Sequence, residues 1–254
     1  MNRPFFLLSN DDGVQAPGLH FLTNTLRQTA DLFVMAPDGP RSGAGCSLTS
    51  SIPLTYRHLS HEDGLDVCAC SGTPVDCVKL ALDQPLRNRR PDLVIGGINH
   101  GNNASINAHY SGTMGVAFEG TLQGIPSIAF SLCNHAEDAD FSPLQPYILR
   151  IVQLVLEKGL PKDTCLNVNF PLAPTFKGIR VCRMARSRWT NEYAAHDRPG
   201  GSRYFWLTGD LLNLEAEADD TDDWALSHGY VAVTPTRIDV TDYPLLDSMK
   251  TWEL

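Results

Sequence analysis

The sequence lacks the C-x-x-C motif. The chain has 254 residues and seven cysteines, and no two cysteines stand in a C-x-x-C motif. An odd number of cysteines without that spacing is a poor framework for disulfides. We therefore expect reduced thiols, most of them buried.

Long hydrophobic runs are missing as well. The apolar run near the start, residues 5–8, is followed directly by polar Ser9 and Asn10. It is too short for a signal peptide, and no other run approaches the roughly 20 residues of a membrane span. We expect no membrane association and a cytoplasmic location.

Positive charge is scarce. The chain has 20 Lys and Arg residues against 29 Asp and Glu residues, for a formal net charge of −9. This balance argues against the long basic face with which proteins bind nucleic-acid polymers. A small anionic ligand would therefore need groups placed locally at its binding site.

Short apolar runs alternate with longer amphipathic segments through the first two thirds of the chain. This alternation is typical of a parallel sheet covered by helices. We expect strands at residues 5–8, 32–36, 93–98 and 127–130, and helices at residues 18–29, 74–83, 114–123 and 144–158. The pattern predicts an α/β fold, with a Rossmann-like three-layer core and a mostly parallel sheet over residues 1–175.

After about residue 175 the pattern changes to strand-like pieces, at 179–184, 204–207 and 230–233. We predict a β-rich extension over residues 176–254, within the same domain. Its aromatic residues are concentrated at Trp189, Tyr193, Tyr204, Phe205 and Trp206. Aromatic surface at this density usually needs a partner. We therefore predict an oligomer in which residues 185–240 reach a neighbouring subunit, although these side chains could instead cover their own core.

Three polar loops follow predicted strands, where open parallel sheets bind their ligands. In the first, Asp11 and Asp12 come directly after a strand and before Gly13. The second, residues 39–45, carries Ser42 among glycines but is neither a Walker loop nor a G-x-G-x-x-G fingerprint. The third begins with Asn99 and continues to Ser111, Gly112 and Thr113 at a helix start that could bind phosphate.

Each loop alone also has an ordinary explanation, as an Asx turn or helix cap, a flexible loop, or an Asn-rich surface loop. Together they supply two carboxylates, a hydroxyl and an amide oxygen. This all-oxygen set favours Mg²⁺, Mn²⁺ or Ca²⁺ over zinc. A metal of this kind polarises phosphoryl oxygens and activates water, so the sequence indicates phosphomonoester hydrolysis.

Five segments closely resemble the SurE family of survival-protein 5′/3′-nucleotidases, in order and in spacing. These are residues 8–13, 41–45, 71–78, 97–103 and 110–113. The resemblance continues at residues 204–207 and 229–235 and covers most of the chain.

The resemblance implies the fold, the metal and the substrate. One divalent ion per subunit, Mg²⁺ or Mn²⁺ first and Ca²⁺ as the alternative, would be held by Asp11, Asp12, Ser42 and Asn99. Phosphate would contact Asn103, Ser111, Gly112 and Thr113. The implied reaction is hydrolysis of nucleoside 5′-monophosphates by a homodimer or homotetramer with a swapped C-terminal part. Activity on 3′-monophosphates and short polyphosphate stays open.

The sequence departs from the family after Asn103. The family often has a small residue, a glycine and acidic residues there, whereas this chain has Ala-Ser-Ile-Asn-Ala-His at residues 104–109. The loop is less negative than usual, which leaves substrate preference open. His100 and His109 could donate to phosphate or act as acid–base groups, or could be structural.

Other mechanisms are compatible with parts of the pattern. A haloacid-dehalogenase-type phosphatase needs a nucleophilic Asp where this chain has Asn10, and a carboxamide cannot form an aspartyl phosphate. Ser42 has no histidine base in its own loop, so we expect it to be a ligand and not a nucleophile. A nucleotide-sensing module could use the same pocket without turnover.

Overall fold

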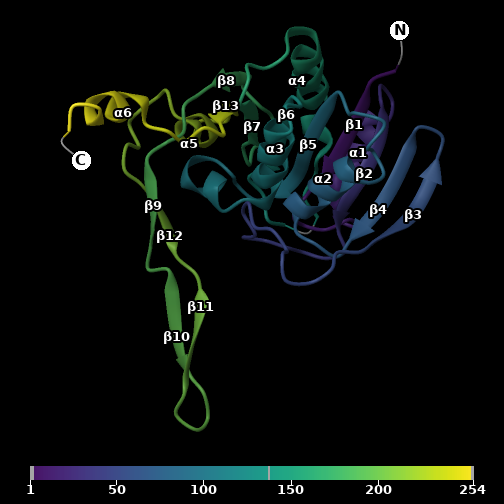
Figure 1. Ribbon diagram of the computed structural model, residues 1–254. Coiled ribbons are helices and arrows are strands. Elements are labelled where there is room, and N and C mark those ends of the chain that lie inside the picture. The colour runs from purple at the N-terminus through teal and green to yellow at the C-terminus, as the bar shows by residue number, and fades with distance from the viewer. Residues whose placement is uncertain (1–2, 137, 253–254) are drawn as a thin grey trace.

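The computed structural model of the protein describes residues 3–136 and 138–252, which are built around a nine-stranded sheet (Figure 1). Across the sheet the strands are β3 (Tyr56–Glu62), β4 (Leu65–Cys70), β2 (Asp31–Pro37), β1 (Phe5–Ser9), β5 (Leu93–His100), β6 (Ser127–Leu132), β7 (Thr164–Phe170), β13 (Val231–Arg237) and β8 (Ile179–Val181). From β4 to β7 all neighbours are parallel, whereas β3 and β13 pair antiparallel with β4 and β7. The predicted mostly parallel α/β core is confirmed.

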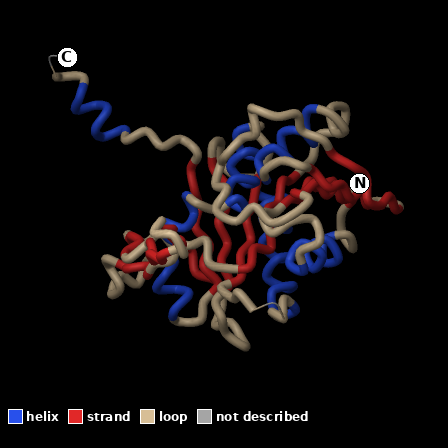
Figure 2. The backbone as a smooth tube through the Cα atoms, turned by 90° about the horizontal axis from the view of Figure 1, so that it is seen from below, coloured by secondary structure: helices blue, strands red, loops and turns tan. Residues whose placement is uncertain are grey.

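Four helices cover the two faces of the sheet (Figure 2). They are α1 (Pro17–Leu26), α2 (Pro74–Asp83), α3 (Gly112–Leu122) and α4 (Gln145–Lys158). Successive strand residues point to opposite faces. Phe6 and Leu8 of β1 accordingly join the cluster with α1 and α4, and Phe5 and Leu7 join the cluster with α2 and α3. The core therefore has three layers.

The predicted segments of the core are all present, and the helix over residues 74–83 has the predicted ends, whereas the ends of the other segments are shifted. The helix expected over residues 18–29 ends at Leu26, and the one expected from residue 114 begins at Gly112. The sequence analysis missed β3, β4 and β7. All seven residues of β3 are exposed, so it shows no apolar face, and polar Asn167 and Asn169 interrupt the apolar pattern of β7.

The fold also contains two short helices and a long hairpin. The short helices are η1 (Ser105–His109) and η2 (Ser142–Leu144). The hairpin, here called the arm, comprises β9 (Ser187–Thr190), β10 (Tyr193–Asp197), β11 (Arg203–Leu207) and β12 (Asp210–Asn213). It projects away from the body of the molecule (Figure 1).

The chain ends with α5 (Asp222–Ser227), β13 and α6 (Tyr243–Met249). The predicted β-rich C-terminal part is confirmed, although β8 and β13 of this part join the main sheet. Its separation from the core near residue 175 and its use in oligomerisation stay predictions.

The structure bears on the state of the cysteines and on the character of the helices. All seven cysteines are free, and five of them are buried. Among the described residues, no helix combines the length and the apolar character needed to cross a membrane. The cytoplasmic location stays a prediction.

Candidate active site

A cavity of about 740 Å³ lies at the carboxyl ends of β1 and β5, between this edge of the sheet and the arm. Such a volume is typical of small-molecule sites. Six of the residues predicted to bind the metal or phosphate line it together: Asp11, Asp12, Ser42, Asn99, Asn103 and Ser111. The structure thus brings the three predicted loops to one place.

Asp11 is buried against the first turn of α3. Its Oδ1 accepts a hydrogen bond from Thr113 Oγ1 at 2.6 Å, and its Oδ2 accepts one from the Gly112 N–H at 3.2 Å. A Cβ at position 112 would lie 2.7 Å from the Asp11 Cβ, so only glycine permits this approach. Burial raises the pKa of Asp11 to about 6. The N-terminus of α3 favours the ionised carboxylate.

Asp12 links the end of β1 to the end of β5. Its Oδ2 accepts a hydrogen bond from the His100 N–H at 3.1 Å, and burial raises its pKa. Asn10 shapes the turn that presents both carboxylates, because its side chain donates to Gly13 O at 3.0 Å and accepts from the Gly13 N–H at 3.2 Å. Asn10 is therefore a turn residue.

Asn99 and Ser42 approach the carboxylates from two other segments. Asn99 Nδ2 donates to Gly101 O at 3.0 Å, which leaves Oδ1 as the oxygen that can serve as a ligand. The loop that carries Ser42 is fixed over the site because the Arg41 N–H donates to Asp11 O at 2.7 Å and the Gly45 N–H donates to Tyr110 O at 3.1 Å.

Asn103 is held by a buried network of side-chain amides. Its N–H donates to Asn169 Oδ1 at 2.9 Å, and its carbonyl accepts from Asn167 Nδ2 at 2.8 Å. Its own Nδ2 donates to Ser131 Oγ at 2.8 Å, and Asn169 Nδ2 donates to Asn167 Oδ1 at 2.8 Å. The sequence analysis missed Asn167, Asn169 and Ser131, although polar residues inside an apolar strand were the visible signal.

The predicted phosphate-contacting residues occupy two kinds of position. Asn103 and Ser111 line the cavity, and Ser111 Oγ also caps α3 by accepting from the Met114 N–H at 3.0 Å. Gly112 and Thr113 lie behind Asp11 and hydrogen-bond to it. Contact with phosphate stays a prediction for all four residues.

The histidines near the three loops differ in whether they line the cavity. His100 lines the cavity, and its ring packs against Phe141 with the ring centroids 5.0 Å apart. His109 is exposed at the end of η1. His135, which carries no motif in the sequence, lines the cavity beside Gly101.

The arm supplies a wall that the sequence analysis did not predict. The arm residues that line the cavity are Trp189, Glu192, Leu207, Thr208 and Leu211. No local sequence motif marks these residues as site residues, because they reach the cavity only through the packing of the hairpin root on the core.

The donor set fits a hard divalent cation. Asp11, Asp12, Ser42 and Asn99 offer carboxylate, hydroxyl and amide oxygens around one cavity. Within residues 3–136 and 138–252, no Lys or Arg side chain forms an ion pair with either carboxylate, and no group of three or more His, Cys, Asp or Glu side chains forms a metal site. A site of two carboxylates and two neutral oxygens suits Mg²⁺, Mn²⁺ or Ca²⁺ and not zinc.

Comparison with known proteins gives a consistent picture. The family model described as survival protein SurE matches residues 6–191. Over 252 residues the chain is 58% identical to a Phocaeicola vulgatus protein and 53% identical to a Bacteroides fragilis protein, both named 5′-nucleotidase SurE. Each alignment covers 99% of this chain and 98% of the relative. The crystal structure of a SurE protein from Aquifex aeolicus superimposes with a TM-score of 0.83 at 39% identity, over 97% of this chain and 98% of that one. The chain belongs to the SurE family.

Proposed function

We propose that the protein is a divalent-metal-dependent 5′-nucleotidase that hydrolyses nucleoside 5′-monophosphates to nucleoside and phosphate. The observation that carries this proposal is the gathering of Asp11, Asp12, Ser42 and Asn99 around one cavity. The relatives named 5′-nucleotidase SurE, which match almost the whole chain, support the reaction and the position of the phosphate.

The side chains at the sheet edge would hold the metal ion and orient its ligands. Asp11, Asp12, Ser42 and Asn99 would hold the ion through oxygen atoms. A bound ion of this class polarises phosphoryl oxygens and lowers the pKa of a coordinated water. The hydrogen bonds from Gly112 and Thr113 keep the Asp11 carboxylate in a single orientation.

Phosphate would lie beside Ser111 and Asn103. The Ser111 hydroxyl accepts a hydrogen bond from the Met114 N–H, and its own hydrogen stays free to donate to a phosphate oxygen. We propose that Ser42 is a ligand and not a nucleophile. Trapping a phosphoserine at position 42 during turnover would contradict this role.

Phosphate release after chelation tests the function. The protein is freed of metal with EDTA, dialysed, and assayed on AMP and GMP with and without added Mg²⁺ or Mn²⁺. We expect release only with the ion, and full activity after exhaustive chelation would overturn the proposal. Binding of AMP with no steady release would favour the nucleotide-sensing alternative. Assays on 3′-AMP and tripolyphosphate define the substrate range.

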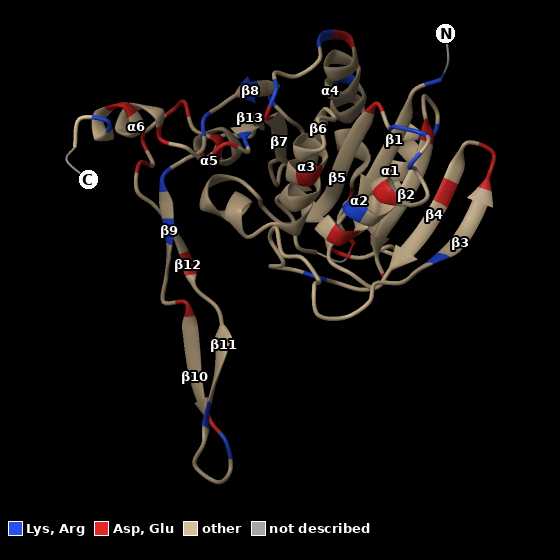
Figure 3. Cartoon of the chain, in the orientation of Figure 1, with Lys and Arg blue, Asp and Glu red and all other residues tan. Residues whose placement is uncertain are grey.

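We also propose that the protein is a homodimer or homotetramer in which the outer part of the arm lies on a second copy. Tyr193, Phe205 and Trp206 of β10 and β11 are 59–68% exposed. Charged residues lie at the tip of the arm and along its inner half, and most of the length of β10 and β11 between them carries none (Figure 3). Exposed apolar area of this kind is typical of interfaces.

Light scattering at micromolar concentration tests the assembly. We expect a mass at least twice the 27.9 kDa of one chain, and we expect deletion of residues 190–206 to yield monomers. A wild-type mass of one chain would overturn the proposal.

A further inference from the structure

The cavity has two chemically different ends, and the metal ligands account for only one of them. At the other end, the lining residues come from the arm and include Trp189, Glu192, Leu207 and Leu211. Tyr110, which is 55% exposed, lines the same cavity. An aromatic and aliphatic wall with one acceptor does not suit phosphate, but it suits a flat, partly polar ring.

Trp189 is fixed in place by three contacts. Its Nε1–H donates to Asn107 Oδ1 of η1 at 3.0 Å, and Leu211 is its partner across the β9–β12 pair. Gly209, at a φ of +121°, lies so close that a Cβ there would be 3.2 Å from Trp189 Cε3. The indole is therefore a preformed surface, and a ligand need not order it.

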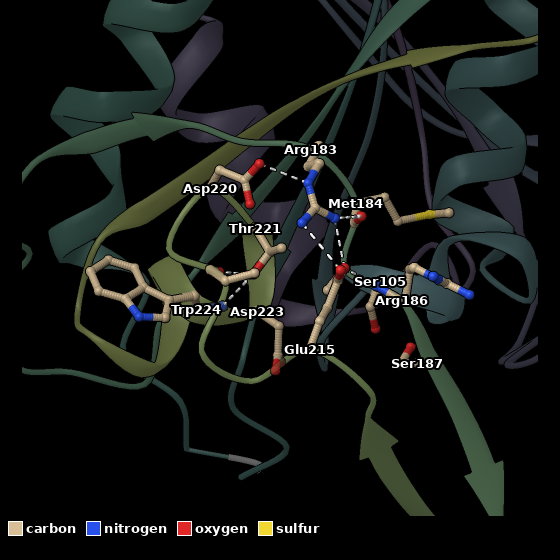
Figure 4. Close-up of polar contacts among 12 residues, drawn as sticks. Ser105, Arg183, Met184, Arg186, Ser187, Glu215, Asp220, Thr221, Asp223 and Trp224 are labelled. Carbon is tan, nitrogen blue, oxygen red and sulfur yellow. Dashed lines mark hydrogen bonds and ion pairs between the residues drawn. The ribbon is translucent and has the colours of Figure 1, made fainter.

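The root of the arm is anchored to the core on both of its strands. Asp222 of α5 accepts hydrogen bonds from the Ser105 and Ala185 N–H groups, both at 2.9 Å. Arg183 bonds to Glu215 at 2.6 Å and to Asp220 at 2.8 Å, which ties the chain entering the arm to the chain leaving it (Figure 4). These contacts hold the aromatic wall at a defined distance from the acidic end.

We propose that the arm end of the cavity is a nucleobase subsite, in which the base stacks on Trp189 and Glu192 accepts a hydrogen bond from a ring N–H or an amino group. The proposal rests on the proposed nucleotidase function. Bases stack on aromatic side chains because both have polarisable flat faces. An ionised carboxylate only accepts hydrogen bonds, so it favours a base edge rich in donors. Guanine, which has an N1–H and a 2-amino group on one edge, should therefore be preferred to hypoxanthine.

A pair of substrates with and without a base tests the stacking. The kcat/KM values for GMP and for ribose 5-phosphate are measured with Mn²⁺ in the wild type, Trp189→Ala, Trp189→Phe and Trp252→Ala. Trp252 is a half-exposed tryptophan at the far C-terminal end and serves as the matched control.

We expect the ratio of the two kcat/KM values to fall about tenfold to a hundredfold in Trp189→Ala, chiefly through the KM for GMP. Trp189→Phe should retain part of the preference, and Trp252→Ala should match the wild type. Equal kcat/KM values for the two substrates in the wild type, or an unchanged ratio in Trp189→Ala, would overturn the proposal.

The Glu192 contact has its own test. Glu192→Gln, which keeps the size of the side chain and removes the charge, should reduce the preference for GMP over IMP by about threefold to tenfold. An unchanged preference would overturn the assignment of Glu192.

Calorimetric titration of GMP in the presence of Mn²⁺ separates this proposal from the proposed function. If the wild type releases no phosphate but binds GMP at least tenfold more tightly than Trp189→Ala does, the subsite is supported and the nucleotidase proposal fails. If the wild type releases phosphate and both proteins bind GMP equally, the nucleotidase proposal holds and the subsite is refuted.

Discussion

The two ends of the cavity differ in how their geometry is fixed. At the sheet edge, Asp11, Asn99 and Asn103 are at most 9% exposed. Asp11 and Asn103 are hydrogen-bonded to neighbouring segments, and Asn99 is hydrogen-bonded to Gly101 of its own loop. On the arm, Leu207 is 70% exposed, and Trp189 depends on a few contacts at the root. Loops and hairpins tolerate change that packed strand ends do not. Under the two proposals above, catalysis would use side chains that the packed sheet holds in place, and base recognition would use side chains of an exposed hairpin.

The largest effect should come from the buried carboxylates. Asp11→Asn keeps the size of the side chain but removes one charge from the metal site, so phosphate release should fall by at least about a thousandfold. Asp63→Asn, in the exposed turn between β3 and β4, is the matched control and should keep wild-type activity. Circular dichroism checks that both variants are folded. Activity of Asp11→Asn within tenfold of the wild type would contradict the proposal that the sheet-edge end of the cavity holds the catalytic groups.

The next effect concerns the close approach of α3 to Asp11. Gly112→Ala would place a Cβ 2.7 Å from the Asp11 Cβ, which displaces the carboxylate and costs about 1–3 kcal/mol of unfolding free energy. Gly39→Ala, in the loop before Ser42, has no atom within 4 Å of the added Cβ and should be nearly neutral. Urea unfolding and phosphate release measure the two variants. Equal free energies of unfolding for the two variants would show that α3 moves away from Asp11 without a loss of stability.

Asparagines of the two regions give a further comparison. Asn169→Ala leaves the buried Asn103 N–H without its acceptor, so we expect a loss of about 1–3 kcal/mol in unfolding free energy. Asn213→Ala on the arm removes a bond to Asp223 and a bond from the Glu215 N–H, both partly open to water, and the loss should stay below about 1 kcal/mol. Asn169→Ala should also lower kcat/KM, because Asn103 lines the cavity. Equal losses from urea unfolding would contradict the contrast.

The smallest effect on overall stability is expected at the root of the arm. Arg183→Gln breaks an exposed ion-pair network, so the Tm should change by no more than about 2 °C. Amide hydrogen exchange in residues 187–213 should nevertheless become faster, while exchange in β1 and β5 stays as in the wild type. Unchanged exchange in the arm would show that the ion pairs of Arg183 do not hold it in place.

Much of the sheet edge could be predicted from the sequence, because strand ends and turn residues are local signals. The strand before Asp11, the turn at Gly13 and the helix near Ser111 all have recognisable patterns, and the cavity unites their polar residues. The sequence could not show that the Thr113 hydroxyl is directed to Asp11, since that depends on how α3 packs on the end of β1.

The arm could be predicted only as strand-like aromatic sequence. Its contacts with the cavity join residues far apart in the chain, such as Trp189 and Asn107, and no pattern within either segment encodes them. The buried amides of β7 were missed for a related reason. In the sequence alone, Asn167 and Asn169 are typical of a loop. Their place in a buried strand is explained only by their hydrogen bonds to Asn103.

Calorimetric titration of Mn²⁺ into the metal-free protein tests most directly the claim that the sheet edge is a metal centre. The wild type should bind one ion per chain, and the Asp11→Asn/Asp12→Asn double variant should bind none at that affinity, while remaining folded by circular dichroism. Stoichiometric binding of Mn²⁺ to the double variant with wild-type affinity would contradict the account.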